Sequence, residues 1–211
     1  MDALAARLVE LRDELGRTVA VGISGIDCAG KSTLAESLRA RLERLSVPTL
    51  VICGDEFTRP TAERYAEPDE GLSYYRDSFD YGFLSDEFLP AVRAGSAGEF
   101  SCDVSDWEND SWRRASFVVP PSGVVLVEGC FLLTRSRSAA FEFRIWIDLP
   151  LDGAIVRALN RPRDLERMGG ASGVRARYER RYLPGQKLHI ELDGPRERAD
   201  VVLSPQETIE S

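Results

Sequence analysis

The sequence predicts an α/β fold in which a parallel β-sheet lies between two layers of helices, a three-layer sandwich. Two observations predict it. Short apolar runs alternate with stretches in which leucine recurs at helical spacing, and a glycine-rich turn separates the first such run from the next helix. The 211 residues, 43% of them hydrophobic, are enough for one well-packed core, so we expect a single domain over 1–211.

The N-terminal half is predicted to begin with a helix and to continue with strands and helices in turn. The first helix is indicated by four leucines at helical spacing: Leu4, Leu8, Leu11 and Leu15. Gly16 follows them and is a typical helix end. Further elements are expected as a buried strand over 18–24, a helix over 31–45, a strand over 47–53 and an amphipathic helix over 79–92.

The C-terminal half is predicted to hold three more strands, over 124–127, 143–147 and 201–203. A helical pattern covers 152–168, but Pro162 should end or kink it because proline lacks the backbone N–H that a helix interior needs. Residues 99–121 contain Trp107 among acids and finish on a Pro-Pro pair. We interpret this segment as a small flap or hairpin inserted beside the sheet.

The charge of the chain limits its partners. With 27 basic and 35 acidic residues the formal charge is −8, which argues against a nucleic-acid polymer or an anionic membrane as partner. No apolar run is long enough to span a bilayer, and the acidic N-terminus lacks a signal-peptide pattern, so a cytoplasmic protein is expected. Four scattered cysteines and one histidine, His189, predict neither a zinc cluster nor a disulfide framework.

The glycine-rich turn matches the phosphate-binding loop GxxxxGK[ST] at every fixed position, and it lies between a predicted strand and a predicted helix. Its backbone N–H groups and the helix N-terminus would cradle phosphates, Lys31 would reach the β- and γ-phosphates, and Ser32 would bind Mg²⁺. Lysine occurs here only at Lys31 and Lys187, which makes a chance match less probable. The fold predicted is therefore that of the P-loop NTPases. The expected nucleotide-binding residues of the loop are Gly25, Asp27, Cys28, Ala29, Gly30, Lys31, Ser32 and Thr33.

Two acids follow predicted strands whose carboxyl ends border the ligand crevice of an open α/β sheet. Asp55 comes after the second strand, where it could accept a hydroxyl proton, and the alternative is a turn cap. Glu128 follows four apolar residues, as the metal-side acid of P-loop proteins does. It could hold Mg²⁺ through water or position Asp55, and the alternative is a solvated strand-end carboxylate.

Arginines gather in the segment 157–187, which holds nine basic and three acidic side chains and so carries +6 within a chain of −8. Such segregation suits an arginine-rich lid that closes over ATP and neutralises charge in the transition state, with nearby glycines as joints. The alternative is a pair of solvated helix faces.

In this order, the motifs resemble the uridine kinase / phosphoribulokinase family of P-loop small-molecule kinases. The matching stretches are GISGIDCAGKST, CGDEF, YYRDSFDYGFL with AVRAG, VVLVEGCFLL, FEFRIWIDLP, RPRDLER and ADVVL. The resemblance implies that Asp55 is the general base, that Ser32 and Glu128 lie on the magnesium side and that Asp77 holds substrate hydroxyls. It also implies that the lid arginines Arg163 and Arg167 contact the ATP phosphates, with Arg163 and Lys31 supporting catalysis.

The flap departs from the family pattern. It carries Cys102 before Asp103 and lacks the histidine that uridine kinases place there, so Trp107, counted with the acceptor pocket, is expected to stack on something other than a pyrimidine base. Tyr75 is counted with the acceptor pocket, although Tyr74 and Tyr75 could instead pack under the lid. His189 is expected to be a satisfied, partly buried histidine.

Together these features predict an enzyme that uses ATP and Mg²⁺ to phosphorylate a hydroxyl of a small metabolite. A nucleoside, uridine by family frequency, is the leading acceptor. The alternatives are pantothenate, a sugar phosphate, nicotinamide riboside or a secondary metabolite. A rival from another class is a nucleotide switch with slow hydrolysis, which needs no acceptor pocket. The sequence leaves open whether the chain forms a homo-oligomer.

Overall fold

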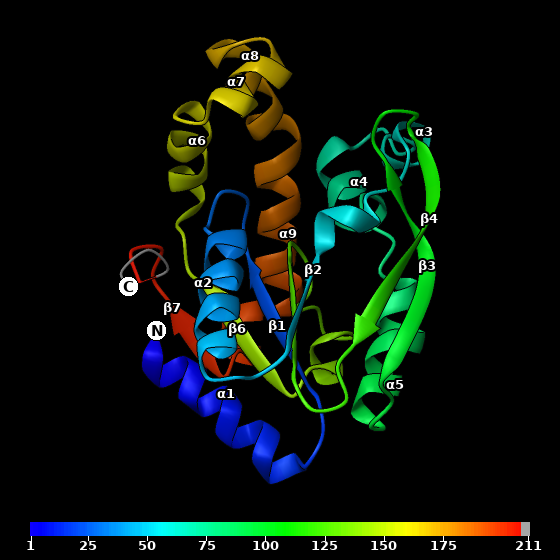
Figure 1. Ribbon diagram of the computed structural model, residues 1–211. Coiled ribbons are helices and arrows are strands. Elements are labelled where there is room, and N and C mark those ends of the chain that lie inside the picture. The colour runs from blue at the N-terminus through cyan, green and yellow to red at the C-terminus, as the bar shows by residue number, and fades with distance from the viewer. Residues whose placement is uncertain (208–211) are drawn as a thin grey trace.

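The computed structural model describes residues 1–207 and is built on one five-stranded sheet (Figure 1). Its strands are all parallel and lie in the order β2-β5-β1-β6-β7. Their bounds are β1 Val19–Gly25, β2 Thr49–Cys53, β5 Val124–Gly129, β6 Phe143–Ile147 and β7 Val201–Leu203. Each of these strands was predicted from its apolar run, and the parallel α/β sandwich is confirmed.

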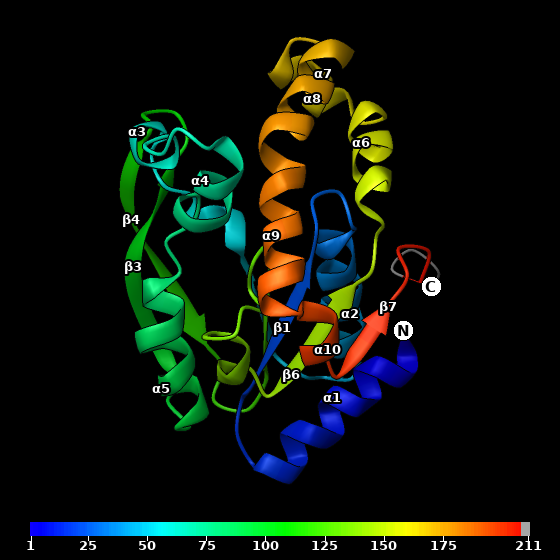
Figure 2. The ribbon, with the colours of Figure 1, turned by 180° about the vertical axis from the view of Figure 1, so that it is seen from behind.

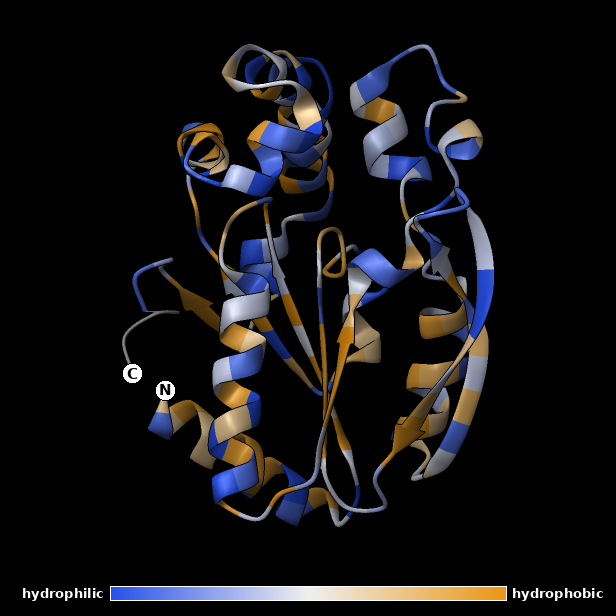
Figure 3. Ribbon diagram, turned by 45° about the horizontal axis from the view of Figure 1, so that its top comes forward, coloured by the Kyte–Doolittle hydropathy of each residue, from blue (hydrophilic) through white to orange (hydrophobic). Residues whose placement is uncertain are grey.

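The two central strands explain why their sequences are uninterrupted apolar runs. Every residue of β1 and β5 is buried, because neighbouring strands cover both edges and helices cover both faces. Val21 on β1 pairs with Leu126 on one side and with Phe143 on the other. The hydrophobic residues of these strands form the middle of the core (Figure 3).

Helices cover both faces of the sheet. α2 lies in front of it in Figure 1, whereas the view from behind in Figure 2 shows α9 in front. The α-helices are α1 Asp2–Leu15, α2 Lys31–Arg44, α3 Thr61–Arg64, α4 Glu70–Asp77, α5 Leu89–Arg93, α6 Leu151–Leu159, α7 Pro162–Met168, α8 Ala171–Arg177, α9 Leu183–Asp193 and α10 Pro195–Arg198. Among the residues described, no helix combines the length and apolarity needed to cross a membrane.

Two of the predicted helix boundaries follow the chemistry of single residues. α1 ends at Gly16, whose φ of 64° is readily available to glycine. The helical pattern over 152–168 is divided, because α6 stops before Pro162 and α7 begins at that proline. Proline is well suited to the first turn of a helix, where no N–H partner is required.

The helix predicted over 79–92 is only partly correct. Residues 79–81 are not helical, the π-helical turn η2 (Phe83–Phe88) follows Gly82, and α5 completes the segment. A second π-helical turn, η4 (Tyr178–Tyr182), joins α8 to α9. Both turns lead directly into a Leu-Pro pair, at Pro90 and at Pro184. A proline ring clashes with the carbonyl four residues earlier, and a wider turn before it relieves that clash.

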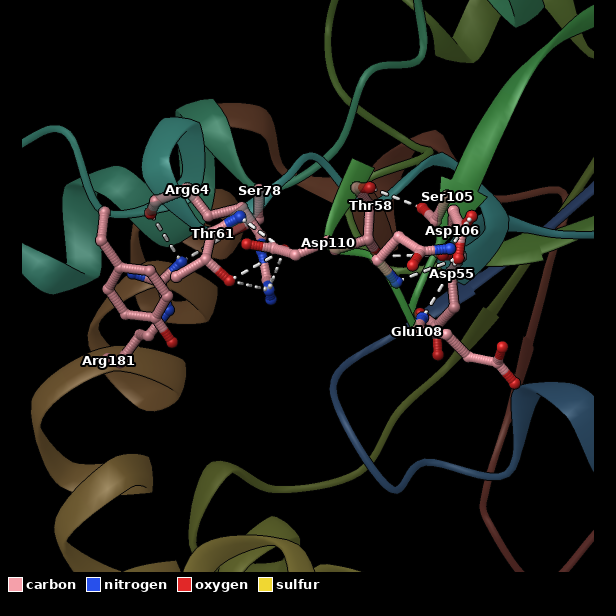
Figure 4. Close-up of polar contacts among 12 residues, drawn as sticks. Asp55, Thr58, Thr61, Arg64, Ser78, Ser105, Asp106, Glu108, Asp110 and Arg181 are labelled. Carbon is pink, nitrogen blue, oxygen red and sulfur yellow. Dashed lines mark hydrogen bonds and ion pairs between the residues drawn. The ribbon is translucent and has the colours of Figure 1, made fainter. Parts of the chain in front are cut away.

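The segment 99–121 contains a two-stranded antiparallel hairpin, β3 (Gly98–Asp106) and β4 (Ser111–Val119), outside the main sheet. Its tip is attached to α3, where Asp110 accepts hydrogen bonds from the backbone N–H and the hydroxyl of Thr61, at 2.8 and 2.9 Å. Lower on the hairpin, the hydroxyl of Ser105 donates to the carbonyl oxygen of Thr58 (Figure 4). The hairpin is thus held at two points against the segment that follows β2.

Candidate active site

The phosphate loop connects β1 to α2, as its sequence predicts. Gly30 has a φ of 107°, which L side chains rarely adopt, so glycine is needed immediately before the helix. Lys31 begins α2, and its Nζ donates to the carbonyl oxygen of Ile26 at 2.9 Å and to Sγ of Cys130 at 3.3 Å. The lysine is therefore folded back over its own loop.

Asp27 links this loop to the helices α4 and α9. Its carboxylate accepts hydrogen bonds from the hydroxyl of Tyr74 on α4, at 2.9 Å, and from the side-chain amide of Gln186 on α9. The thiol of Cys130 donates to it at 3.4 Å. Burial raises the pKa of Asp27 above its ordinary value, and the charge of Lys31 opposes that shift. The carboxylate fixes the loop relative to α4 and α9.

The groups around Asp27 also affect the pKa of Lys31. Burial by itself would lower the pKa of Lys31, but the negative groups around it, including Asp27, Glu128 and Asp55, outweigh burial and raise its pKa. The lysine therefore stays protonated at neutral pH. A fixed ammonium at the start of α2 is suited to binding the phosphates of a nucleotide.

Ser32 and Glu128 meet at the sheet edge beside the loop. The Ser32 hydroxyl donates to Oε1 of Glu128 at 2.9 Å, and Glu128 is only 4% exposed at the end of β5. A hydroxyl and a carboxylate are hard oxygen ligands of the kind Mg²⁺ takes, alongside water and substrate phosphates. The part of the chain described contains no cluster of three or more His, Cys, Asp or Glu side chains that could hold a metal. These two residues fit a magnesium ion bound largely through the nucleotide.

Asp55 lies in the 3₁₀ turn η1 (Gly54–Phe57), directly after β2. Its backbone oxygen accepts from the hydroxyl of Thr58 at 2.8 Å, and Thr58 is in turn held by the hairpin through Ser105 (Figure 4). The turn is therefore anchored through its backbone. The Asp55 carboxylate is exposed and is one of the charges that raise the pKa of Lys31.

One cavity of about 600 Å³ joins these groups. It extends from the phosphate loop to the turn after β2 and to the tip of the hairpin, and the segment 161–168 closes one side. Its lining includes most of the residues predicted from sequence: Asp27, Cys28, Gly30, Lys31, Ser32, Thr33, Asp55, Trp107, Glu128, Arg163 and Arg167. Gly25 and Ala29 belong to the loop but do not line the cavity.

Two predicted acceptor residues lie elsewhere. The Tyr75 hydroxyl donates to Asp193 at 2.7 Å, away from the cavity, because successive side chains on α4 point about 100° apart and Tyr74 faces the phosphate loop. Asp77, expected to hold substrate hydroxyls, is the last residue of α4 and does not line the cavity. The structure therefore does not bring Tyr75 and Asp77 together with Asp55.

The predicted lid arginines occupy different positions. Arg163 is 70% exposed and lies 3.8 Å from Asp164, whereas the guanidinium of Arg167 lies 5.8 Å from the ring centre of Trp107. Two other arginines of the same segment reach the phosphate loop directly. Arg157 donates to the carbonyl oxygen of Cys28 at 3.1 Å, and Arg161 donates to the Cys28 thiol at 3.3 Å.

Sequence reasoning missed several residues at this site. Tyr74 was left undecided, while Gln186, Arg64 and Arg181 were not singled out as site residues, yet all four contact the loop or line the cavity. They come from α4, α9, α3 and η4, which only tertiary packing brings to the cavity. No local motif marks them, and the density of arginine over 157–187 was the one available signal.

Comparisons with known proteins agree with this geometry. The chain is 27% identical over 197 residues to proteins named uridine kinase from Salmonella paratyphi B and Salmonella typhi, with 92% of this chain and 90% of each relative covered. No family model matches the sequence.

Solved structures share the fold at lower identity. A possible uridine kinase from Bacillus stearothermophilus superposes with a TM-score of 0.70 at 21% identity, covering 95% of this chain and 99% of that one. A putative fructose transport system kinase from Silicibacter sp. TM1040 gives a TM-score of 0.72 at 21% identity, covering 92% and 98%. For phosphoribulokinase from Rhodobacter spheroides the TM-score is 0.56 at 15% identity, with 86% and 68% covered.

A phosphate loop at the carboxyl ends of a parallel sheet, acids at the ends of β2 and β5 and this set of relatives define an ATP-dependent kinase with the P-loop fold. Within that class, the chain resembles the uridine kinase / phosphoribulokinase family: relatives named uridine kinase align with most of its length, and phosphoribulokinase shares its fold.

Proposed function

We propose that the protein transfers the γ-phosphoryl group of ATP to a hydroxyl of a small metabolite, with Mg²⁺ as cofactor. The observation that carries the proposal is that Asp55 and the Lys31–Ser32 pair line one cavity. The names of the relatives make uridine the first acceptor to test. Segments 99–121 and 157–187 would act as flap and lid of a single cytoplasmic domain.

The roles follow from chemistry and position. The loop amides and Lys31 would hold the triphosphate, and the arginines of the lid would balance charge as it develops. Magnesium, held beside Ser32 and Glu128, would neutralise phosphate charge. Asp55 would take the proton of the acceptor hydroxyl. That oxygen forms a bond to the γ-phosphorus while the bond from phosphorus to the β–γ bridging oxygen breaks, and ADP leaves.

Asp55→Asn tests this proposal. It keeps the size of the side chain and removes its basicity, so phosphoryl transfer should fall by about 10²–10⁴-fold while ATP affinity changes by less than about threefold. ADP formation with an acceptor panel gives the rate, and calorimetry gives the affinity. Asp86→Asn makes the same chemical change on an exposed residue outside the cavity and should leave both values unchanged.

One outcome of this experiment would contradict the proposed kinase function. ADP formation that needs no acceptor and survives Asp55→Asn would favour a nucleotide switch with slow hydrolysis over a kinase.

A further inference from the structure

A second cavity, of about 420 Å³, adjoins the first and is lined by three arginines and no acid. Arg64 comes from α3, Arg167 from α7 and Arg177 from α8. The remaining lining residues are Thr61, Tyr65, Met168 and Tyr182. The two cavities share Arg64, Arg167, Met168 and Tyr182, so the arginine-lined space opens beside the cavity that contains Asp55.

The positive charge of this second cavity is poorly neutralised. Within residues 1–207, neither Arg167 nor Arg177 has a carboxylate within 4.0 Å; Arg177 donates instead to the hydroxyl of Tyr65. Arg64 lies 3.9 Å from Asp110, and its buried Nε has no hydrogen-bond partner. Three guanidinium groups thus face one space with a single, distant counter-charge.

Arg181 is a fourth cation close to this group of arginines. It is 1% exposed and lines the larger cavity, and the described chain offers it no carboxylate partner. It donates to the carbonyl oxygens of Arg64 and Glu70 and to the hydroxyl of Ser78, at 3.2 Å or less, and lies 4.0 Å from the ring centre of Tyr65. Figure 4 shows it together with Arg64 and Ser78. Burying a cation without an anion is costly, and a bound anion would compensate that cost.

The position of the cluster separates it from the nucleotide. No residue of the phosphate loop lines the second cavity, and Arg64 belongs to the segment that follows Asp55. We propose that Arg64 and Arg177, which line the second cavity, form a subsite for an anionic group, phosphate or carboxylate, carried by the phosphoryl acceptor, with Arg181 as a further buried cation against the same Tyr65 ring. The inference rests on the proposed kinase function. It favours a phosphorylated or carboxylated metabolite, such as a sugar phosphate, over a neutral nucleoside.

Matched acceptor pairs test the subsite. Two sets are compared, glycerol with glycerol 3-phosphate and glycerol with glycerate, with saturating ATP and Mg²⁺ and ADP formation as readout. In at least one set, kcat/KM for an anionic member should exceed that for its neutral partner by about 10- to 100-fold, the effect of one or two charge-assisted hydrogen bonds. The phosphate and carboxylate members identify which group the subsite takes.

Arginine variants test the residues. Arg177→Gln and Arg64→Gln should weaken the anionic acceptor about 10- to 100-fold more than its neutral partner, mainly through KM. Arg175→Gln is the matched control, because Arg175 is exposed on the same helix as Arg177 and lines neither cavity. A preference for neutral acceptors, or equal effects of all three variants, would overturn the subsite.

A binding measurement covers the case in which no acceptor of the panel reacts. Inorganic phosphate is titrated by calorimetry into protein saturated with a non-hydrolysable ATP analogue and Mg²⁺. Binding that Arg177→Gln weakens and Arg175→Gln does not would keep the subsite even if the kinase proposal failed. Absence of binding, or phosphate that displaces the ATP analogue, would overturn it. Transfer to an anionic acceptor, abolished by Asp55→Asn but indifferent to Arg177→Gln, would keep the kinase and remove the subsite.

Discussion

Lys31 is held in place by contacts within the protein. Its ammonium bonds to the Ile26 carbonyl and the Cys130 thiol, while Asp27, Glu128 and Asp55 keep it charged. A phosphate that enters the loop exchanges these contacts for its own oxygens. The lysine loses little further side-chain freedom when it does so, because it is already confined.

Glu128→Gln is the corresponding test of the magnesium side. The amide keeps an acceptor for the Ser32 hydroxyl but removes the charge, so half-saturation of activity should need at least about tenfold more Mg²⁺. ATP affinity measured without Mg²⁺ should stay within about twofold of the parent. Chelation with EDTA should abolish transfer by the parent protein. An unchanged Mg²⁺ requirement in the variant would place the ion elsewhere.

At the residue scale, the sequence could predict groups whose position follows from local geometry. Lys31 and Ser32 lie in a fixed motif, and Asp55 and Glu128 follow strands whose carboxyl ends share one edge of the sheet. Arg64 and Gln186 could not be predicted as site residues, because they reach the cavity through the packing of whole helices. Their local sequence is that of ordinary surface helices.

At the scale of elements, α4 and α9 are joined by one carboxylate. Asp193 accepts hydrogen bonds from the Tyr75 hydroxyl at 2.7 Å, from the backbone N–H of Arg135 at 3.0 Å and, at 2.8 Å, from Nδ1 of His189. Burial alone would raise the pKa of the Asp193 carboxyl, but hydrogen bonds from His189, Arg135 and Tyr75 outweigh burial and lower it to about 2. The carboxylate is therefore a structural junction between the helix that carries Tyr74 and the helix that carries Gln186.

Asp193→Asn should lower the free energy of unfolding at pH 7 by about 2 kcal/mol, since a pKa lowered by nearly two units corresponds to that stabilisation. The folded-state pKa lies below the unfolded value, so the stabilisation is present above about pH 4 and is lost as the pH falls towards 2. Urea unfolding of both proteins between pH 2 and 7 measures the difference. A difference that stays constant over that range would show that the charge of Asp193 contributes nothing.

The prolines show which helix boundaries can be predicted from the sequence and which cannot. The break at Pro162 was predicted because proline lacks the backbone N–H that a helix interior needs. Pro90 and Pro184 instead follow π-helical turns and leave the helical path continuous. Whether a proline ends a helix or widens the turn before it depends on tertiary contacts, such as those that bury Tyr178 and Arg181 in η4.

For the molecule as a whole, the nucleotide should stabilise the fold. At a concentration one hundred times its dissociation constant, ATP with Mg²⁺ adds about 2.7 kcal/mol, or roughly 5–10 °C in Tm for a chain of this length. Lys31→Ala should remove most of that shift. Lys187→Ala replaces the only other lysine, which is 64% exposed, and should keep it. Thermal scans with and without ATP measure both, and a full shift in Lys31→Ala would exclude the loop as the binding site.

The separation of charge across the molecule has a consequence for which anions can gather on it. The exterior of a chain of −8 repels polyanions, whereas the arginine-lined cavity of about 420 Å³ attracts any negative group that fits. We therefore expect the surface acids to repel long polyanions and the cavity to attract small anions that fit into it. On this argument the electrostatic field of the protein would favour small anions over polyanions before any specific contact forms.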